Sequence, residues 1–259
     1  MKKRKINESV YFALRNGRLV LGLSIILVFL VLAWIGPLIV RNEPFAYVNP
    51  MGPQPPSSDY WFGTTFFGQD IFAQFVLGLR ATFFVGLLGG GIGTLIGMLV
   101  GFIAGYRGGL VDELLQIPTN IVQVLPTLAV LLVIAAYLQV RSLITEGIFI
   151  GLTAWPWTAR AIRAQTFSLR TRDFVDMAKM SGMRSLKIIF TEIAPNMMSY
   201  LVMAFILQFG GAILNAATLD FFGLGPSKGV SLGLMMQWAL QWGSDRKSTR
   251  LNSSHVSES

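Results

Sequence analysis

The 259-residue sequence contains no cysteine and a single histidine, His255. The lack of cysteine excludes disulfide bonds, thiolate metal sites and a cysteine nucleophile. One histidine in an unusual polar tail argues against histidine metal chemistry. The phosphate-binding pattern Gly-x-x-x-x-Gly-Lys-Ser/Thr is also missing, and the glycine-containing run at residues 223–228 does not match it. We therefore expect a chain that does not itself hydrolyse ATP.

Charged residues are scarce as well. They make up 13% of the chain, whereas soluble domains carry roughly 25%. Hydrophobic residues make up 53%, and the mean hydropathy is +0.58. The 27 glycines and 11 prolines follow no three-residue period, which excludes a collagen-like chain. This composition is that of an integral membrane protein.

The net charge of +8 comes from basic residues that cluster beside apolar segments. In that position they orient a membrane protein, because short cytoplasmic loops carry an excess of lysine and arginine. Membrane lipid is therefore an expected partner, and nucleic acid is not.

Apolar segments that cross about 30 Å of hydrocarbon need roughly 20 residues. The chain is predicted to be an all-α, polytopic membrane protein with five such spans. They cover about residues 19–40, 81–106, 114–138, 143–159 and 197–219. Pro118 and Pro126 interrupt the third span, and the fourth could continue to Phe167. A cleaved signal peptide is the alternative for the first span, but its apolar stretch is too long and no small-residue cleavage site follows.

The basic residues also predict the orientation. Residues 1–18 hold six basic residues against one acidic residue, and residues 160–195 hold seven basic residues, so both segments are expected in the cytoplasm. Residues 41–80 are expected outside, and residues 81–243 form the main transmembrane domain. Residues 244–259 are polar and atypical. We expect either an altered or truncated C-terminus that has lost a sixth span, or a natural disordered tail.

Six glycines recur at a spacing of four residues in and after the second span. They are Gly89, Gly93, Gly97, Gly101, Gly105 and Gly109. Small residues at this spacing let helices in lipid approach closely. A four-residue step exceeds one helical turn by about 40°, so the stripe winds around its helix and could serve more than one neighbour. Two interpretations stay open: generic packing, and a helix that slides or rocks during a working cycle.

The basic segment at residues 160–195 has the pattern of helix, glycine and second helix. Asp173 can cap the first helix, with Asp176 in its first turn. Gly182 suits a left-handed C-cap. Ser185 can cap the second helix, which Pro195 is expected to end or kink.

One face of the first of these helices is small and apolar. Phe174, Ala178 and Ser181 share that face, with Val175 and Met177 on its flanks. Such a helix can insert into a groove on a partner. It can equally lie on anionic lipid headgroups. The periodicity does not decide between these two interpretations.

Several motifs accompany this loop. Before the second span the chain contains Phe62-Gly63-Thr64, Gly68-Gln69-Asp70 and Gly78-Leu79-Arg80. Later motifs are Gly105-Tyr106-Arg107-Gly108-Gly109, Trp155-Pro156-Trp157-Thr158-Ala159-Arg160 with Arg163, and Leu219 with residues 221–225. With them, roughly residues 15–243 of the chain resemble the inner-membrane permease subunits of binding-protein-dependent ABC importers. The resemblance is greatest to the C-type subunits of the dipeptide, oligopeptide and nickel branch.

The cytoplasmic loop of that family reads Glu-Ala-Ala, three residues, Gly, then about ten residues and Ile-Leu-Pro. By the resemblance, the ATPase-coupling loop holds Asp176, Met177, Ala178, Gly182, Ile193 and Pro195, with Arg160 and Arg163 at its start. Asp176 replaces the family's Glu, Met177 its first Ala, and Ala194 its Leu. Ile117 and Asn120 stand where members often carry an Arg-x-x-Asp pair.

The resemblance implies the type I permease fold of ABC importers, with five of an expected six spans present. It implies a multi-pass protein of the bacterial inner membrane with a cytoplasmic N-terminus. The implied partners are ATP-binding subunits, a second homologous permease subunit and an extracytoplasmic substrate-binding protein. ATP would be bound by the partner subunits, so the chain itself needs no cofactor. The two permeases would together form the path for peptides or a related small solute.

Two other classes of protein fit the sequence less well. A secondary transporter without an ATPase partner normally holds charged residues inside its spans. The second, third and fifth predicted spans contain none. A membrane enzyme needs a constellation of reactive side chains. Asp112, Glu113 and Asp220 are scattered at span ends, where they are expected as helix caps or interface residues.

Overall fold

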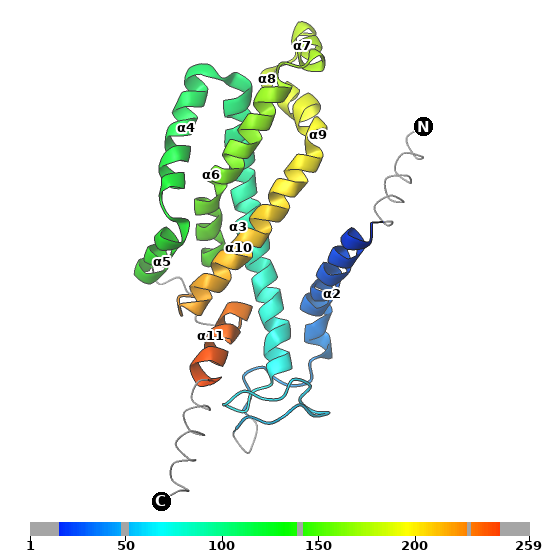
Figure 1. Cartoon of the computed structure of the whole chain (residues 1–259), viewed down its shortest axis with the longest axis vertical. Coiled ribbons are helices and arrows are strands. Elements are labelled where there is room, and N and C mark those ends of the chain that lie inside the picture. Colours follow the sequence, from blue (N-terminus) through cyan, green and yellow to red (C-terminus); the bar gives the residue numbers. More distant parts are fainter. Residues whose placement is uncertain (1–15, 48–51, 139–141, 227–228, 244–259) are drawn as a thin grey trace, which may run out of the picture. The chain divides into compact units, whose positions relative to one another are not determined.

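The computed structural model describes residues 16–47, 52–138, 142–226 and 229–243. The helices, shown in Figure 1, are α2 (Gly17–Ile39), α3 (Ile71–Arg107), α4 (Gly109–Val124), α5 (Thr127–Leu138), α6 (Leu143–Leu169), α7 (Asp173–Met180), α8 (Ser185–Ile188), η1 (Ile189–Ile193), α9 (Ala194–Asn196), α10 (Met198–Phe221) and α11 (Leu232–Gly243). Extended pairing in the described residues is limited to one isolated bridge, between Thr64 and Asp70. The prediction of an all-α chain is therefore confirmed for the part of the chain that the structure describes.

Three of these helices, α2, α3 and α10, are long and apolar enough to cross a membrane. The pair of α4 and α5 passes the same test as one unit, with a bend of 78° between the two helices. The 27-residue helix α6 is long enough, but Glu146, Pro156 and Arg160 lower its hydropathy. The described residues thus contain three or four candidate spans where the sequence predicts five, and α6 accounts for the difference.

The two prolines of the third predicted span have different effects. Pro126 lies in the break between α4, which ends at Val124, and α5. Proline restricts the preceding residue and cannot donate the next helical hydrogen bond, so the chain bends there. Pro118 lies inside α4 without ending it. The third span is therefore a bent pair of helices.

The chain divides into two compact units, residues 1–80 and 81–259. In the first unit, Asp70 caps the start of α3. Its Oδ1 accepts a hydrogen bond from the Phe72 N–H at 2.8 Å, and its Oδ2 accepts one from Asn42 Nδ2 at 2.8 Å. A side-chain oxygen at this position satisfies a backbone donor that the helix leaves free. The same carboxylate holds the segment after α2 against the start of α3.

In the second unit, α3 and α6 pack with their backbones in close contact along a glycine seam. The seam consists of Gly89, Gly93, Gly97, Gly101 and Gly105 of α3. A Cβ placed on Gly97 would lie 2.6 Å from the Thr158 Cβ, and one on Gly101 would lie 2.7 Å from the Ala159 carbonyl oxygen. Real Cβ atoms do not approach other atoms so closely, so only glycine allows this distance between the two helices.

The glycine seam runs in the same direction along both helices. Gly89 faces Gly147, and sixteen residues later Gly105 faces Arg163. The helices α3 and α6 are therefore parallel, and α4 and α5 return the chain between them. Each four-residue step turns the stripe about 40° further around α3, so α6 must wind with it to stay in contact. Gly109, the sixth predicted member, instead begins α4 with a φ of +54° and faces no atom within 4 Å.

A second set of glycines on α3 receives α10. Gly86 faces Ile213, and Gly90 faces the backbone of Phe209, so α10 runs antiparallel to α3. Gln208 Nε2 of α10 also donates a hydrogen bond to the Ala154 carbonyl of α6 at 2.8 Å. The winding stripe thus serves mainly α6, while neighbouring glycines accommodate the other helix.

Two carboxyl groups are buried in the second unit. Asp220 was expected as a cap or interface residue, but it is only 2% exposed and accepts a hydrogen bond from the Ser231 hydroxyl. The Ser231 oxygen accepts a hydrogen bond from the Leu234 N–H at 3.1 Å at the start of α11. Asp220 is therefore an internal link between α10 and α11. Glu146 in the first turn of α6 is 1% exposed, and neither of its carboxyl oxygens has a partner in the described residues.

The glycine seam makes Gly101→Ala a test of the fold. The added Cβ would collide with backbone atoms of α6, so we expect the substitution to destabilise the protein by about 1–3 kcal/mol. The thermal unfolding midpoint in detergent measures this loss.

Gly91→Ala is the matched control on the same helix, because a Cβ there meets no atom within 4 Å. Alanine favours helix over glycine by about 1 kcal/mol, so this variant should be as stable as the natural protein or slightly more stable. Equal midpoints for the two variants would contradict the close packing of α3 on α6.

Candidate functional site

The segment between α6 and α10 holds most of the predicted site residues. It comprises a turn at residues 170–172, α7, a second turn at residues 181–184, and the continuous run of α8, η1 and α9. Figure 1 shows α7 at the end of its unit that lies opposite α11. Because α6 and α10 run in opposite directions, the segment closes this end of the helical unit.

Both helix starts in the segment differ from the prediction by one residue. Asp173 is the first residue of α7, and the N-cap is Arg172, with no side-chain cap hydrogen bond. Ser185 likewise begins α8 after Arg184 as N-cap. Asp173 and Asp176 still lie in the first turn of α7, where a carboxylate interacts favourably with the positive end of the helix dipole.

Gly182 terminates α7 in a Schellman motif. Its φ is +74°, which confirms the predicted left-handed conformation. The Gly182 N–H donates to the Lys179 carbonyl at 3.0 Å, and the Met183 N–H donates to the Ala178 carbonyl at 3.2 Å. Met183 then packs on the apolar cluster that contains Ala178. Together these contacts fix the angle between α7 and α8.

The second helix of the segment does not end at Pro195. The backbone passes from α8 into the π-helix η1 and then into α9, and the helical run breaks only at Met197, whose φ is −115°. Proline lacks an N–H, and the wider π turn directly before it accommodates that missing hydrogen bond. Ile193 is fully buried at the end of η1, whereas Pro195 is exposed.

One face of α7 is buried against the apolar core of the second unit. Val175 and Ala178 are 0% and 5% exposed, and they pack in a cluster with Ile188, Ile193 and Phe102. The predicted face of Phe174, Ala178 and Ser181 is therefore not an open surface for a partner groove or for lipid, because Ala178 is buried and Phe174 packs against the same cluster. The small Ala178 lets α7 lie close to α8 and η1.

The opposite face of α7 is open. Met177 and Met180 are 58% and 80% exposed, and Asp173, Asp176 and Ser181 are exposed beside them. We call Met177 and Met180 the methionine face. Sequence reasoning gave no role to Met180, although two methionines three residues apart lie on the same side of a helix and are a usable signal.

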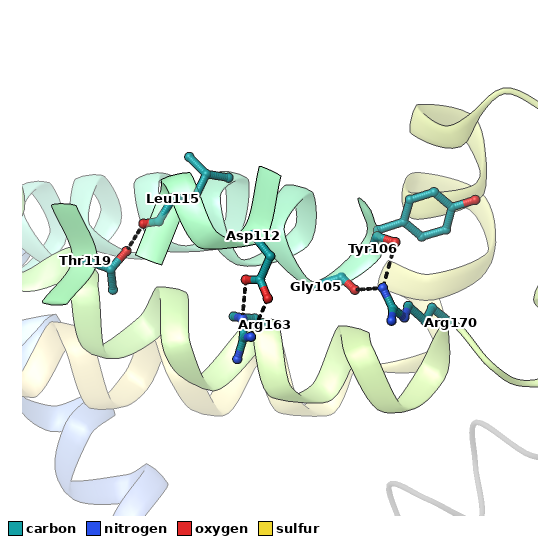
Figure 2. Close-up of polar contacts among 7 residues, drawn as sticks. All are labelled: Gly105, Tyr106, Asp112, Leu115, Thr119, Arg163 and Arg170. Carbon is teal, nitrogen blue, oxygen red and sulfur yellow. Dashed lines mark hydrogen bonds and ion pairs between the residues drawn. The ribbon is translucent and has the colours of Figure 1, made fainter. Parts of the chain in front are cut away.

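The two arginines at the start of the loop bind groups on α4. Arg163 Nε and Nη2 donate to the two carboxylate oxygens of Asp112 in a bidentate ion pair, shown in Figure 2. Arg160 Nη2 donates to Asn120 Oδ1 at 2.8 Å. Asp112 was expected only as a helix cap or interface residue, and the structure shows that it also ties α4 to α6. The sequence gave no signal for this pairing, because 51 residues separate its members.

The ion pair of Arg163 and Asp112 can be tested by a double-mutant cycle of Arg163→Gln and Asp112→Asn. Each single change leaves one group without its charged partner, whereas the double change removes both. We expect a coupling energy of about 0.5–3 kcal/mol in unfolding experiments in detergent.

Arg184→Gln combined with Asp112→Asn is the control cycle. Arg184 is exposed and takes part in no ion pair within the described ranges. Its effect should add to that of Asp112→Asn, and additivity in the Arg163 cycle as well would show that the pair contributes no coupling.

The described residues bring together no group of three or more His, Asp or Glu side chains that could hold a metal ion. The polar groups of the loop are instead used in helix termini and in contacts between helices. The segment is thus a short helix with one anchored face and one open face, mounted on the ends of α6 and α10.

Comparison with known proteins gives a consistent result. Residues 97–248 match the family described as the binding-protein-dependent transport system inner membrane component. The chain is 36% identical to the dipeptide transport system permease protein DppC of Alkalihalophilus pseudofirmus, with 82% of this chain and 69% of the relative covered. It is 31% identical to the oligopeptide transport system permease proteins OppC of Bacillus subtilis (85% and 72% covered) and Mycobacterium bovis (86% and 77% covered).

Proposed function

The chain belongs to the family of inner membrane components of binding-protein-dependent transport systems, and from this membership we propose that it imports peptides as one of two paired permease subunits. As a permease component of such an ABC transport system it is a non-catalytic membrane subunit. The substrate class rests on the relatives, which are dipeptide and oligopeptide permeases. Membership in this family also argues against a secondary transporter that works without an ATPase.

The observation that supports the coupling role is that α7 is buried on one side and exposed on the other. Val175 and Ala178 anchor one side in the core, so a force on α7 reaches α8, η1 and α10 through packed atoms. The methionine face on the other side is free to enter an apolar groove of an ATP-binding subunit. Methionine side chains are flexible and polarizable, which suits such a contact.

We assign the coupling loop to Asp176, Met177, Ala178, Gly182, Ile193 and Pro195, with Arg160 and Arg163 at its start. In this assignment Asp176 and Met177 face the ATP-binding subunit, and Gly182 sets the angle of α7. Ala178 and Ile193 serve as internal anchors. The partner subunits bind ATP, and an extracytoplasmic binding protein delivers the substrate.

We further propose five spans, with α6 counted as the fourth, and a cytoplasmic N-terminus. The parallel course of α3 and α6 supports this arrangement, because it brings the turn after Arg107 and the helix α7 to the same side of the membrane. The C-terminal end of α3 and the loop that contains α7 both carry basic residues, as cytoplasmic loops do. Residues 41–80 then lie outside, where the binding protein would dock, and the type I permease fold follows from the resemblance.

Gly182→Val tests the coupling loop. A Cβ at this position meets no atom within 4 Å, so only the positive φ opposes the change. A side chain in this conformation costs roughly 1–2 kcal/mol, which should tilt α7 and reduce co-purification of the ATP-binding subunit about tenfold.

The matched control is Gly182→Asn, because asparagine adopts the left-handed conformation far more readily than valine. This variant should keep most of the ATPase association and most of the transport in liposomes. Equal co-purification of the ATPase with Gly182→Val and with the natural protein would contradict the proposed docking.

The orientation can be tested with Lys179→Cys, since the chain has no other cysteine. In intact cells we expect a membrane-impermeant maleimide to leave this position unlabelled and to label it only after the membrane is opened. Ser57→Cys, in the segment proposed to lie outside, should show the reverse. Labelling of Lys179→Cys from outside would exclude a cytoplasmic loop.

A further inference from the structure

Arg170 connects the loop segment to a helix far away in the sequence. It is the C-cap residue of α6, and its guanidinium extends to the last turn of α3 (Figure 2). Its Nη1 donates hydrogen bonds to the carbonyl oxygens of Gly105 at 3.3 Å and Tyr106 at 3.4 Å. The last four carbonyls of a helix lack partners within the helix and form the negative end of its dipole. Arg170 therefore caps α3 with a positive charge from α6.

The surroundings of this guanidinium restrict its position. The Phe167 ring centroid lies 4.1 Å from the Arg170 Cζ, a distance typical of a cation–π contact. On another side lies Gly108, where a Cβ would be 2.6 Å from Nη1. The arginine is thus held among an aromatic ring, two carbonyls and a turn that leaves no room for a larger residue.

The backbone of the same residue is linked to α7. Lys179 Nζ donates a hydrogen bond to the Arg170 carbonyl at 3.3 Å and lies 2.8 Å from Asp176 Oδ1. Residue 170 therefore touches α7 through its backbone and α3 through its side chain. It lies at the loop end of the glycine seam, one turn beyond the contact of Gly105 with Thr166.

From these contacts we infer that Arg170 is a positioning residue that fastens the C-terminus of α3 to the turn between α6 and α7, so that a displacement of α7 moves α3 and α6 together. This inference rests on the proposed coupling of α7 to an ATPase. Near the start of α6, Leu88 and Ile92 of α3 pack onto Gly147 and Gly151. At the loop end of the seam, α3 presents Gly101 and Gly105, which have no side chain to interlock with α6 and resist sliding. A charged contact at the end of the seam supplies that resistance.

The test uses Arg170→Gln in the complete transporter, assembled with its second permease, its ATP-binding subunits and its binding protein in liposomes. Spin labels at Arg107→Cys on α3 and Ser168→Cys on α6 report the distance between the two helix ends by dipolar broadening. In the natural background we expect the same broadening without nucleotide and with ADP and vanadate. With Arg170→Gln we expect the broadening to differ between the two states, because the helices now slide.

Transport of radiolabelled trialanine per ATP hydrolysed is the second readout. We expect Arg170→Gln to keep ATPase association and hydrolysis while transport per ATP falls about tenfold. Arg172→Gln, an exposed residue in the same turn, is the control and should behave as the natural protein. Arg170→Lys keeps the charge but has no planar guanidinium to lie over the Phe167 ring, so its ratio should fall about threefold. If Arg170→Gln is not recovered from the membrane, the Arg170→Lys variant decides the test.

Constant broadening together with an unchanged transport ratio in the Arg170 variants would overturn the inference. Loss of ATPase association in Arg170→Gln alone would overturn it too, because Arg170 would then support docking rather than join α3 to α6. Failure of the proposed function is a separate outcome. It would appear in the natural protein, as an ATPase that does not co-purify.

Discussion

The close approach of α3 and α6 is the constraint on which the rest of the second unit depends. In a membrane the lipid tails are as apolar as the side chains, so helices gain little from hydrophobic burial and associate through close packing. The glycine seam brings the two backbones close enough for that packing over five successive contacts. Since the helices are parallel, the seam also brings the end of α3 to the beginning of the loop segment. The contacts of Arg163 and Arg170 both depend on this placement.

The loop segment shows how a short helix can be both exposed and rigid. An isolated eight-residue helix is marginal in water, because nucleation is unfavourable. Here α7 is stabilised by two apolar anchors, a Schellman motif at Gly182 and acidic residues in its first turn. The π-helix η1 turns Ile189 and Ile193 into the same core without a break in the chain. A helix held in this way can transmit a displacement instead of absorbing it.

The polar groups between helices follow one pattern. Gln208 and Arg163 each contact a partner on another helix, and Asp220 contacts Ser231, which directly precedes α11. Other buried oxygens lack a partner in the described part of the chain: both carboxyl oxygens of Glu146, Oδ1 of Asp220, and the hydroxyls of Thr94, Thr158 and Thr166. Burial of such a group is unfavourable.

Local chemistry in the sequence was enough to predict the helical class, the bounds of the first and last spans to within two residues, and the left-handed turn at Gly182. The spans follow from the length of the apolar segments, and the turn follows from the positive φ that glycine adopts readily. The motifs also identified the family, which the comparisons confirm. The sequence did not reveal that α3 begins at Ile71, because Asp70 and the polar residues around it resemble a loop until their hydrogen bonds are seen.

Only the tertiary structure decided which face of α7 is open and which residues join the helices. Ala178 looked like a contact for a partner because it is small, yet small residues also suit close packing within the chain, and periodicity cannot separate the two uses. The pairing of Arg163 with Asp112 and the capping of α3 by Arg170 join residues more than 50 positions apart. Such contacts depend on where the glycine seam places the helix ends, and that placement exists only once the helices have packed.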